Sequence, residues 1–212
     1  MTIKLTTSGF TLIELIIGMT IFSIGLAGIY ALLQTTMSTV RYSRDEIVVS
    51  GLLREQIDLV MSIRDTNLRN YIPWDSVFID PPVSDTALTA GIYTIENNYT
   101  TASIVIDQNV GTISSSPIKV TKLATFPVTD EDKWSIAQLR LDNQGRYIHS
   151  QTIGTGTQYA SYIIVSPLSI NSVDVKKDGK NQGWIIDARV LIKGNGYYRE
   201  YDAKSMVTDW QK

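Results

Sequence analysis

The sequence predicts an α+β protein in which a long N-terminal helix packs on a C-terminal antiparallel β-sheet domain. Two observations support this prediction. The segment from 10 to 72 contains no proline and is apolar first and amphipathic later, whereas the chain after Gly91 consists of short β-rich runs separated by polar turns. Because those runs follow one another without intervening helical patterns, we expect an antiparallel sheet.

The composition excludes several kinds of site. The chain has 212 residues and a formal net charge of −2, so it has no global positive field that would attract nucleic acid or anionic lipid. It contains no cysteine, which rules out disulfides, zinc–thiolate sites and cysteine nucleophiles. A single histidine, His149, removes most histidine-based metal sites and catalytic triads.

The first part of the predicted helix is long enough to cross a membrane. The run from Phe10 to Leu33 has 24 residues and would span about 36 Å, against about 30 Å for the hydrocarbon core of a bilayer. It is too long for the apolar region of a secretory signal peptide, which has about 7–15 residues. Glu14 is the only charged residue between Phe10 and Val40.

A charged side chain in such a segment needs an explanation, because a central one costs roughly 2.5–3.5 kcal/mol. An uncleaved membrane anchor explains the length of the run but not its glutamate. We find no partner for Glu14 in its own segment and expect one in another molecule. Gly18, Gly25 and Gly28 share one side of a helical wheel, either as a packing face or as glycines that a membrane helix tolerates.

The residues around Glu14 resemble a known motif. Gly9-Phe10-Thr11-Leu12-Ile13-Glu14, directly before a membrane-length run, is similar to the processing motif of type IV pilins and type II secretion pseudopilins. The resemblance implies that a prepilin peptidase cleaves after Gly9 and N-methylates Phe10, and that Glu14 acts in assembly. Family leaders are usually rich in Lys and Arg, whereas this one has only Lys4, so a cytoplasmic leader is inferred mostly from the resemblance.

The resemblance also suggests a partner for the glutamate. Cleavage would create an α-amine on Phe10, which is cationic near neutral pH because its reference pKa is roughly 7.7–8. In a staggered filament this amine can meet Glu14 of a neighbouring subunit, which pairs both charges and sets the register. The implied partners are the peptidase and methyltransferase, other pilin or pseudopilin subunits, an inner-membrane assembly platform and, before assembly, membrane lipid.

The helix should continue beyond the apolar run. From Val40 onward, apolar residues recur three or four positions apart with charged residues between them, so we expect one helix from about residue 10 to about residue 68. Pro73 should end it, and Trp74 and Phe78 should be loop aromatics that close over the core. Pro81-Pro82 and Ser84-Asp85 should continue this loop.

These elements imply three parts of the chain. A leader at 1–9 is removed, a helix at 10–70 spans the membrane at about 10–33, and 71–212 forms the globular β domain. A turn at Asn97-Asn98 should join the first two strands of the domain, and a turn at 142–145 should form another hairpin. The predicted strands are 92–95, 102–106, 118–123, 136–141, 146–149, 162–165, 173–175, 184–192 and 197–201, with later turns at Asp178-Gly179 and Gly194-Asn195-Gly196.

No constellation predicts catalysis, a cofactor or a metal. Asp130-Glu131-Asp132 supplies clustered oxygens but matches no calcium-binding loop. His149 should be a partly exposed strand residue without a partner. Asn98-Tyr99-Thr100 fits a glycosylation sequon only out of context, and basic and aromatic residues form no platform that would argue for nucleic-acid binding, although the net charge does not forbid it.

The sequence therefore predicts a structural subunit rather than an enzyme. The last hairpin, 190–201, and the tail, 205–210, resemble those of minor pilins, and the globular part is large for a major pilin. We expect a minor subunit of a type IV pilus or a type II secretion pseudopilus, anchored in the inner membrane and then part of an extracellular or periplasmic filament. The alternative is an uncleaved, single-pass extracytoplasmic binding domain.

Overall fold

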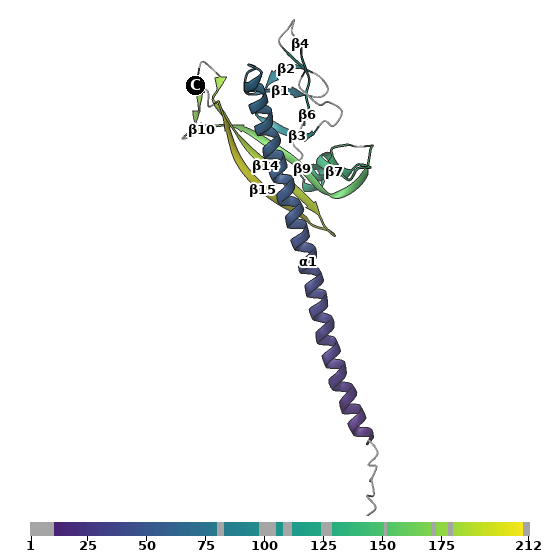
Figure 1. The fold of residues 1–212 in the computed structure, drawn as a ribbon. Helices are drawn as coiled ribbons and strands as arrows, with labels where there is room; N and C mark the ends of the chain where they lie inside the picture. The colour runs from purple at the N-terminus through teal and green to yellow at the C-terminus, as the bar shows by residue number, and fades with distance from the viewer. Residues whose placement is uncertain are drawn as a thin grey trace, which may run out of the picture. The chain divides into compact units, whose positions relative to one another are not determined.

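The computed structural model describes residues 11–79, 83–97, 105–107, 112–123, 129–150, 152–170, 173–177 and 180–209. The chain divides into two compact units, residues 1–48 and 49–212. Helix α1, Leu12–Arg69, contributes residues to both units (Figure 1). The expected single helix, ending near residue 68, is confirmed over its described length.

The second unit is built on a nine-stranded sheet. Its main path has the order β15-β14-β9-β3-β6-β1-β2, and β7 pairs with β9 and with β8. All these pairings are antiparallel except a single contact between β1 and β6, so the expected α+β class with an antiparallel sheet is confirmed. The strands are β1 Ser76–Ile79, β2 Val83–Ala87, β3 Gly91–Asn97, β6 Ile118–Lys122, β7 Gln138–Leu141, β8 Tyr147–Ile148, β9 Thr155–Pro167, β14 Gly183–Lys193 and β15 Tyr198–Thr208.

The part of α1 that belongs to this unit, from Val49 onward, packs on one face of the sheet, as Figure 1 shows. Its buried residues lie three or four positions apart, which is the spacing of one helix face. Facing them, Ile186, Ala188 and Val190 alternate along β14 and are fully buried. Trp74 is also buried and lines the space between helix and sheet, as expected. The buried residues of α1 are Val49, Leu52, Leu53, Gln56, Leu59, Val60 and Asn67.

A second, smaller core lies on the opposite face of the sheet. Helix α2, Asp130–Ala137, places Ala137 against Ala160 and Tyr162 of β9 and Leu191 of β14. This helix was not expected, and the strand predicted at 136–141 begins only at Gln138. The physical reason is local: Thr129 caps the helix by accepting a hydrogen bond from the Asp132 N–H, with three acidic residues in the first turn.

Strand pairing differs from the expected hairpin between 92–95 and 102–106. β3 pairs with β6 and β9, whereas β4, Val105–Asp107, pairs with β5, Thr112–Ser115. The segments expected to be loops around Phe78 and Ser84 form β1 and β2. These errors share a cause, because partner choice depends on contacts between distant segments rather than on the local pattern.

Two of the remaining hairpins are confirmed, whereas the strand expected at 173–175 pairs with Ser169–Ile170 and not with 184–192. β7 and β8 pair through Arg140↔Ile148, and β14 and β15 pair in register over eleven residues, from Gly183↔Thr208 to Lys193↔Tyr198. The tail at 205–208 continues strand β15. Two short ribbons, β10 Ser169–Ile170 with β11 Val173–Asp174 and β12 Lys176–Lys177 with β13 Lys180–Asn181, join β9 to β14. The turns expected at Asn97-Asn98 and Asp178-Gly179 lie partly or wholly outside the described residues.

Candidate functional site

The predicted processing site borders the described part of the chain. Gly9 and Phe10 lie outside the described residues, so cleavage and methylation there stay predictions. The Asn98-Tyr99-Thr100 sequon also lies outside them. Glu14 is described and belongs to the first turn of α1, where a carboxylate interacts favourably with the helix dipole.

Thr11 and Glu14 form a capping box at the start of α1. The Thr11 backbone N–H and hydroxyl donate to Glu14 Oε2 at 3.0 and 2.8 Å, and the Glu14 N–H donates back to Thr11 Oγ1 at 3.4 Å. Our expectation that Glu14 finds no partner in its own segment is therefore wrong for hydrogen bonds. The pattern Thr-x-x-Glu before an apolar run was the available signal. Among the described residues, no cation forms an ion pair with this carboxylate.

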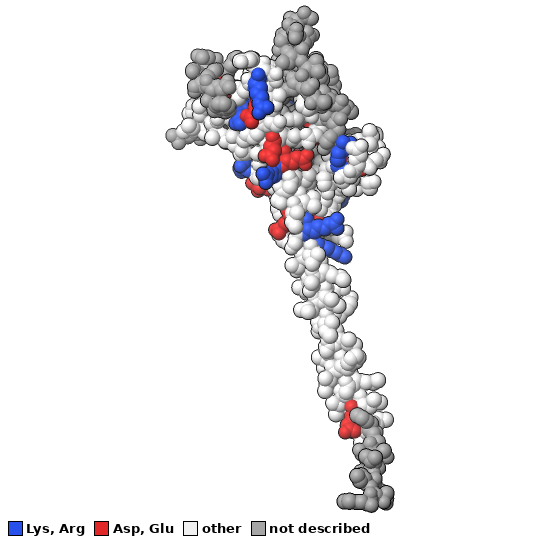
Figure 2. Space-filling model, viewed as in Figure 1, with Lys and Arg blue, Asp and Glu red and all other residues white. Residues whose placement is uncertain are grey.

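The rest of the apolar run meets the requirements of a membrane span. An 18-residue window of α1 has a mean hydropathy of 2.1 and none of it is buried. In Figure 2 the corresponding part of the helix is a long surface without charge. In this part of α1, three hydroxyls donate to backbone carbonyls one turn earlier at 2.7–2.8 Å, so these three need no water: Thr20 to Ile16, Ser23 to Met19 and Thr36 to Leu32. Glu14 is thus the exceptional residue of the run.

His149 has partners, contrary to the expectation that it has none. It follows β8 at the place where β3 separates from β9, beyond the last pair, Tyr93↔Ile163. Its Nε2 lies 2.8 Å from the Ser161 carbonyl oxygen, and its backbone N–H donates to Glu96 Oε2 at 2.6 Å. The side chain is only 11% exposed, and this burial lowers its pKa. His149 therefore links two strands that no longer pair with each other.

Ser161, His149 and Glu96 are the residue types of a Ser–His–Glu catalytic triad, but the distances between them do not fit a catalytic arrangement. Ser161 Oγ lies 3.3 Å from His149 Nε2, and Glu96 Oε2 lies 3.8 Å from Nδ1, beyond hydrogen-bonding distance. The Nε2 proton is directed to the nearer Ser161 carbonyl oxygen. Ser161 is 3% exposed and faces a cavity of about 10 Å³, which a substrate could not enter.

On its other side, His149 lines a polar cleft of about 410 Å³. One wall is formed by Thr94, Lys119 and Thr121 of β3 and β6, and the other by α2 and β7. The lining is rich in hydroxyl, amide and cationic groups, so the cleft suits a small polar molecule better than an apolar one.

The three acidic side chains at 130–132 all form contacts within the protein. Asp132 accepts a hydrogen bond from the Thr129 hydroxyl at 2.6 Å, Asp130 pairs with Lys133 at 3.0 Å, and Glu131 lies 3.8 Å from Lys193. In the described part of the chain, no group of three or more His, Cys, Asp or Glu side chains is placed to hold a metal. These carboxylates therefore cap and anchor α2.

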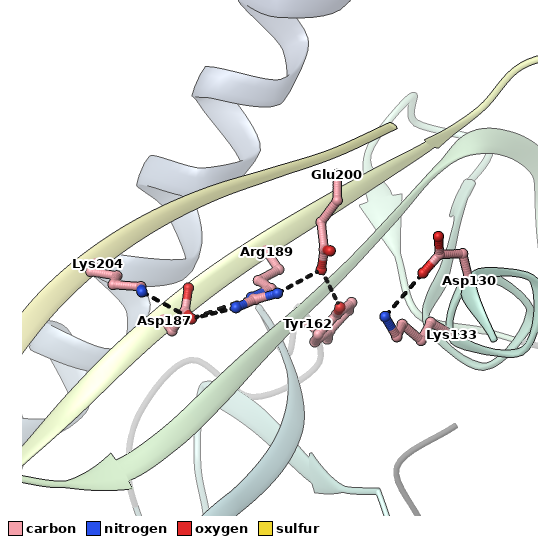
Figure 3. Close-up of polar contacts among 7 residues, drawn as sticks. All are labelled: Asp130, Lys133, Tyr162, Asp187, Arg189, Glu200 and Lys204. Carbon is pink, nitrogen blue, oxygen red and sulfur yellow. Dashed lines mark hydrogen bonds and ion pairs between the residues drawn. The ribbon is translucent and has the colours of Figure 1, made fainter. Parts of the chain in front are cut away.

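A polar network that the sequence did not reveal connects β9, β14 and β15 (Figure 3). Arg189 donates to Asp187 Oδ2 at 2.8 Å and to Glu200 Oε1 at 3.0 Å, and the Tyr162 hydroxyl donates to Glu200 Oε1 at 2.6 Å. Lys204 Nζ lies 3.8 Å from Asp187. The available signal was the two-residue spacing of Asp187 and Arg189, which puts both side chains on one face of a strand.

Tyr162 and Arg189 each keep one ionisation state across ordinary pH. Burial, together with the hydrogen bond to Glu200, raises the pKa of Tyr162 well above its usual range. The hydrogen bonds to Asp187 and Glu200 raise the pKa of Arg189 further above neutrality. Tyr162 therefore stays neutral and Arg189 stays charged, as a structural cross-link between strands requires.

Comparison with known proteins identifies the N-terminal segment. Residues 6–30 match the family described as the prokaryotic N-terminal methylation motif. No curated protein and no solved structure shows significant similarity to the chain. The matched residues include Gly9, Phe10 and Glu14 and extend over most of the apolar run. The chain thus carries the N-terminal signature of the type IV pilin-like proteins, a structural rather than an enzymatic family.

Proposed function

We propose that this protein is a minor structural subunit of a type IV pilus or a type II secretion pseudopilus. The prepilin peptidase would remove residues 1–9 and methylate the amine of Phe10. The subunit would wait in the inner membrane with α1 across the bilayer and then enter a filament through the assembly platform. The observation that carries the proposal is the position of Glu14, the only acidic residue in an otherwise uncharged span, within the matched motif.

The capping box suggests how the Glu14 carboxylate is stabilised in the membrane before assembly. In the bilayer, its carboxylate is partly compensated by the Thr11 N–H and hydroxyl, so insertion does not leave all its acceptor sites empty. These hydrogen bonds supply no opposite charge, whereas the cleaved amine of a neighbouring subunit would. Assembly would therefore replace a hydrogen-bonded carboxylate by a paired one, which favours docking in a single register.

The hydroxyl and glycine residues of the run are compatible with both environments. The hydroxyls bond to their own helix, and a Cβ built at Gly18, Gly25 or Gly28 would meet no atom within 4 Å. Neighbouring helices could therefore replace lipid at this surface without a rearrangement inside the subunit. The minor-subunit assignment depends on the globular part, which is large for a major pilin, and on the resemblance of the last hairpin and the residues after it to those of minor pilins.

Mass spectrometry of the protein from cells with an active peptidase tests the processing step. The mature chain should begin at Phe10 and carry one extra methyl group. An intact Met1 terminus under those conditions would contradict the proposal and favour an uncleaved, membrane-anchored binding domain.

The assembly step is tested by Glu14→Val. This variant should insert into the membrane at least as well as the wild type but fail to enter filaments, because the partner of the Phe10 amine is lost. Glu46→Val, which removes another exposed carboxylate of α1, is the matched control and should assemble normally. Normal incorporation of the Glu14 variant would rule out the pairing.

A further inference from the structure

Tyr71, two residues after the end of α1 at Arg69, has two unusual properties. Among the described residues other than glycine, Tyr71 alone has a positive φ, 57°, in the left-handed region that L side chains rarely adopt. Its side chain is also 99% exposed, so the aromatic ring packs against nothing in the isolated protein. An aromatic residue at such a position gains no burial that would offset its backbone strain.

The end of the helix explains the backbone of Tyr71. The Ile72 N–H donates to the Asn67 carbonyl at 3.0 Å, and the Tyr71 N–H donates to the Leu68 carbonyl at 3.3 Å. These two bonds define a Schellman motif in which Tyr71 occupies the left-handed position. Glycine is the usual residue there, and asparagine is the next most suitable, because both tolerate the conformation.

Tyr71 is held by a rigid base. Asn67, fully buried, donates from Nδ2 to the Ser76 carbonyl at 2.6 Å and to the Trp74 carbonyl at 3.3 Å. Ile72 and Trp74, the residues on either side of Pro73, are 8% and 9% exposed and anchor the turn in the core. The exposed ring is therefore presented from a fixed backbone rather than from a mobile loop tip, which lowers the entropy lost on binding.

We infer that Tyr71 is a docking residue that inserts its ring into a recess on a neighbouring pilin-like subunit. This inference rests on the proposed function, because a filament subunit must contact its neighbours through two different surfaces. Tyrosine supplies a rigid, amphipathic contact and is enriched at interface hot spots. Arg69 and Asn70, both exposed, flank the ring. The recess should therefore be apolar at its centre, with carbonyl or carboxylate acceptors at its rim.

The absence of cysteine from the chain allows a specific cross-linking test. Arg69→Cys, which keeps the Tyr71 ring and places an exposed thiol beside it, labelled with a thiol-directed photo-cross-linker, should form covalent adducts with pilin-like subunits when filaments are illuminated. Tyr197→Cys is the control, because Tyr197 is also an exposed aromatic, at 54%, but has ordinary backbone geometry. Adducts only with lipid, or only with proteins that are not filament subunits, would overturn the inference.

Tyr71→Asn tests the energetic side. The variant should be at least as resistant to thermal unfolding as the wild type, because asparagine accepts the left-handed conformation. Its incorporation into filaments should fall about tenfold, the effect of losing a modest interface hot spot, whereas Tyr197→Asn should assemble normally. If the wild type assembles and Tyr71→Asn is incorporated equally well, the docking inference is refuted but the proposed function is not. A wild type that never enters filaments would refute the proposed function and the docking inference with it.

Discussion

Acidification should destabilise the globular unit through His149. This is the only histidine in the chain, and burial between β3 and β9 lowers its pKa below the ordinary value of about 6.5. At a pH between these two pKa values, His149 is therefore mostly neutral in the folded protein and mostly protonated in the unfolded chain. The stabilisation is present in full above about pH 6.5 and is lost as the pH falls towards the lowered pKa of the folded state.

The size of the effect follows from one titrating group. Uptake of a single extra proton by the unfolded state gives a slope of at most about 1.4 kcal/mol of unfolding free energy per pH unit. Charging the ring would place a cation near Lys119, although the Glu96 carboxylate, 3.8 Å from Nδ1, favours that cation. Burial is the largest cause of the lowered pKa, so the slope should be measurable against a typical stability of about 5–15 kcal/mol.

His149→Gln provides the comparison, because its amide can donate to the Ser161 carbonyl but does not titrate. Unfolding free energies of the full chain in detergent micelles would be measured by urea denaturation at several values between pH 7.5 and 5. Tryptophan fluorescence would follow the transition, since Trp74 and Trp184 are buried. The wild type should lose stability relative to the variant below about pH 6.5. A difference that stays constant over the whole range would refute the reasoning.

Other acidic groups act on both proteins and cancel in this comparison. Glu55 is exposed on α1, but partial desolvation by its neighbours raises its pKa, and its hydrogen bond to Asn97 opposes the rise. Its contribution to stability therefore has the opposite sign and increases as the pH falls towards the ordinary carboxyl pKa. Because Glu55 is present in the wild type and in His149→Gln, the difference between them isolates the histidine.

Two further predictions use matched pairs of variants, with unfolding free energy as the measurement. Arg189→Met should cost about 2 kcal/mol because it leaves Asp187, 8% exposed, without its principal partner, whereas Arg54→Met, in a pair with side chains 84% and 67% exposed, should change stability by less than about 0.5 kcal/mol. Equal effects would contradict the structural role of the network. Gly154→Ala should cost about 2–3 kcal/mol, because its φ is 85° and the added Cβ would collide with the Leu141 carbonyl. Gly145→Ala, at φ 76° with open space, should cost about 1 kcal/mol, and a cost as large as that at Gly154 would remove the steric argument.

Much of helix α1 could be predicted directly from the sequence. The length of α1, its apolar and amphipathic parts and the exceptional position of Glu14 depend on residues within a few turns of one another. Local rules also contain the Thr11–Glu14 capping box, because the pattern Thr-x-x-Glu before an apolar run is its sequence signature. The same rule, applied to Thr129 and the acidic residues after it, would have predicted the start of α2.

The sheet shows where local rules stop. The β7–β8 and β14–β15 hairpins join neighbouring segments through short turns, and both were predicted. The partners of β3 are separated from it by long stretches of chain, and nothing in residues 91–97 specifies that β6 and β9 will lie beside them. The contact of His149 with Ser161 depends on that pairing, because the carbonyl becomes available only where β3 leaves β9.

The sequence by itself determined the signature at Gly9, Phe10 and Glu14, the single long helix and the α+β class, because short-range hydrogen bonding and hydrophobic periodicity specify them. Only the tertiary structure decided that His149 links two separated strands, that Arg189 connects two carboxylates and that Tyr71 is held exposed in a left-handed conformation. The first two depend on contacts between distant segments, and the third depends on the backbone geometry at the end of a helix. The spacing of residue types alone specifies neither kind of feature.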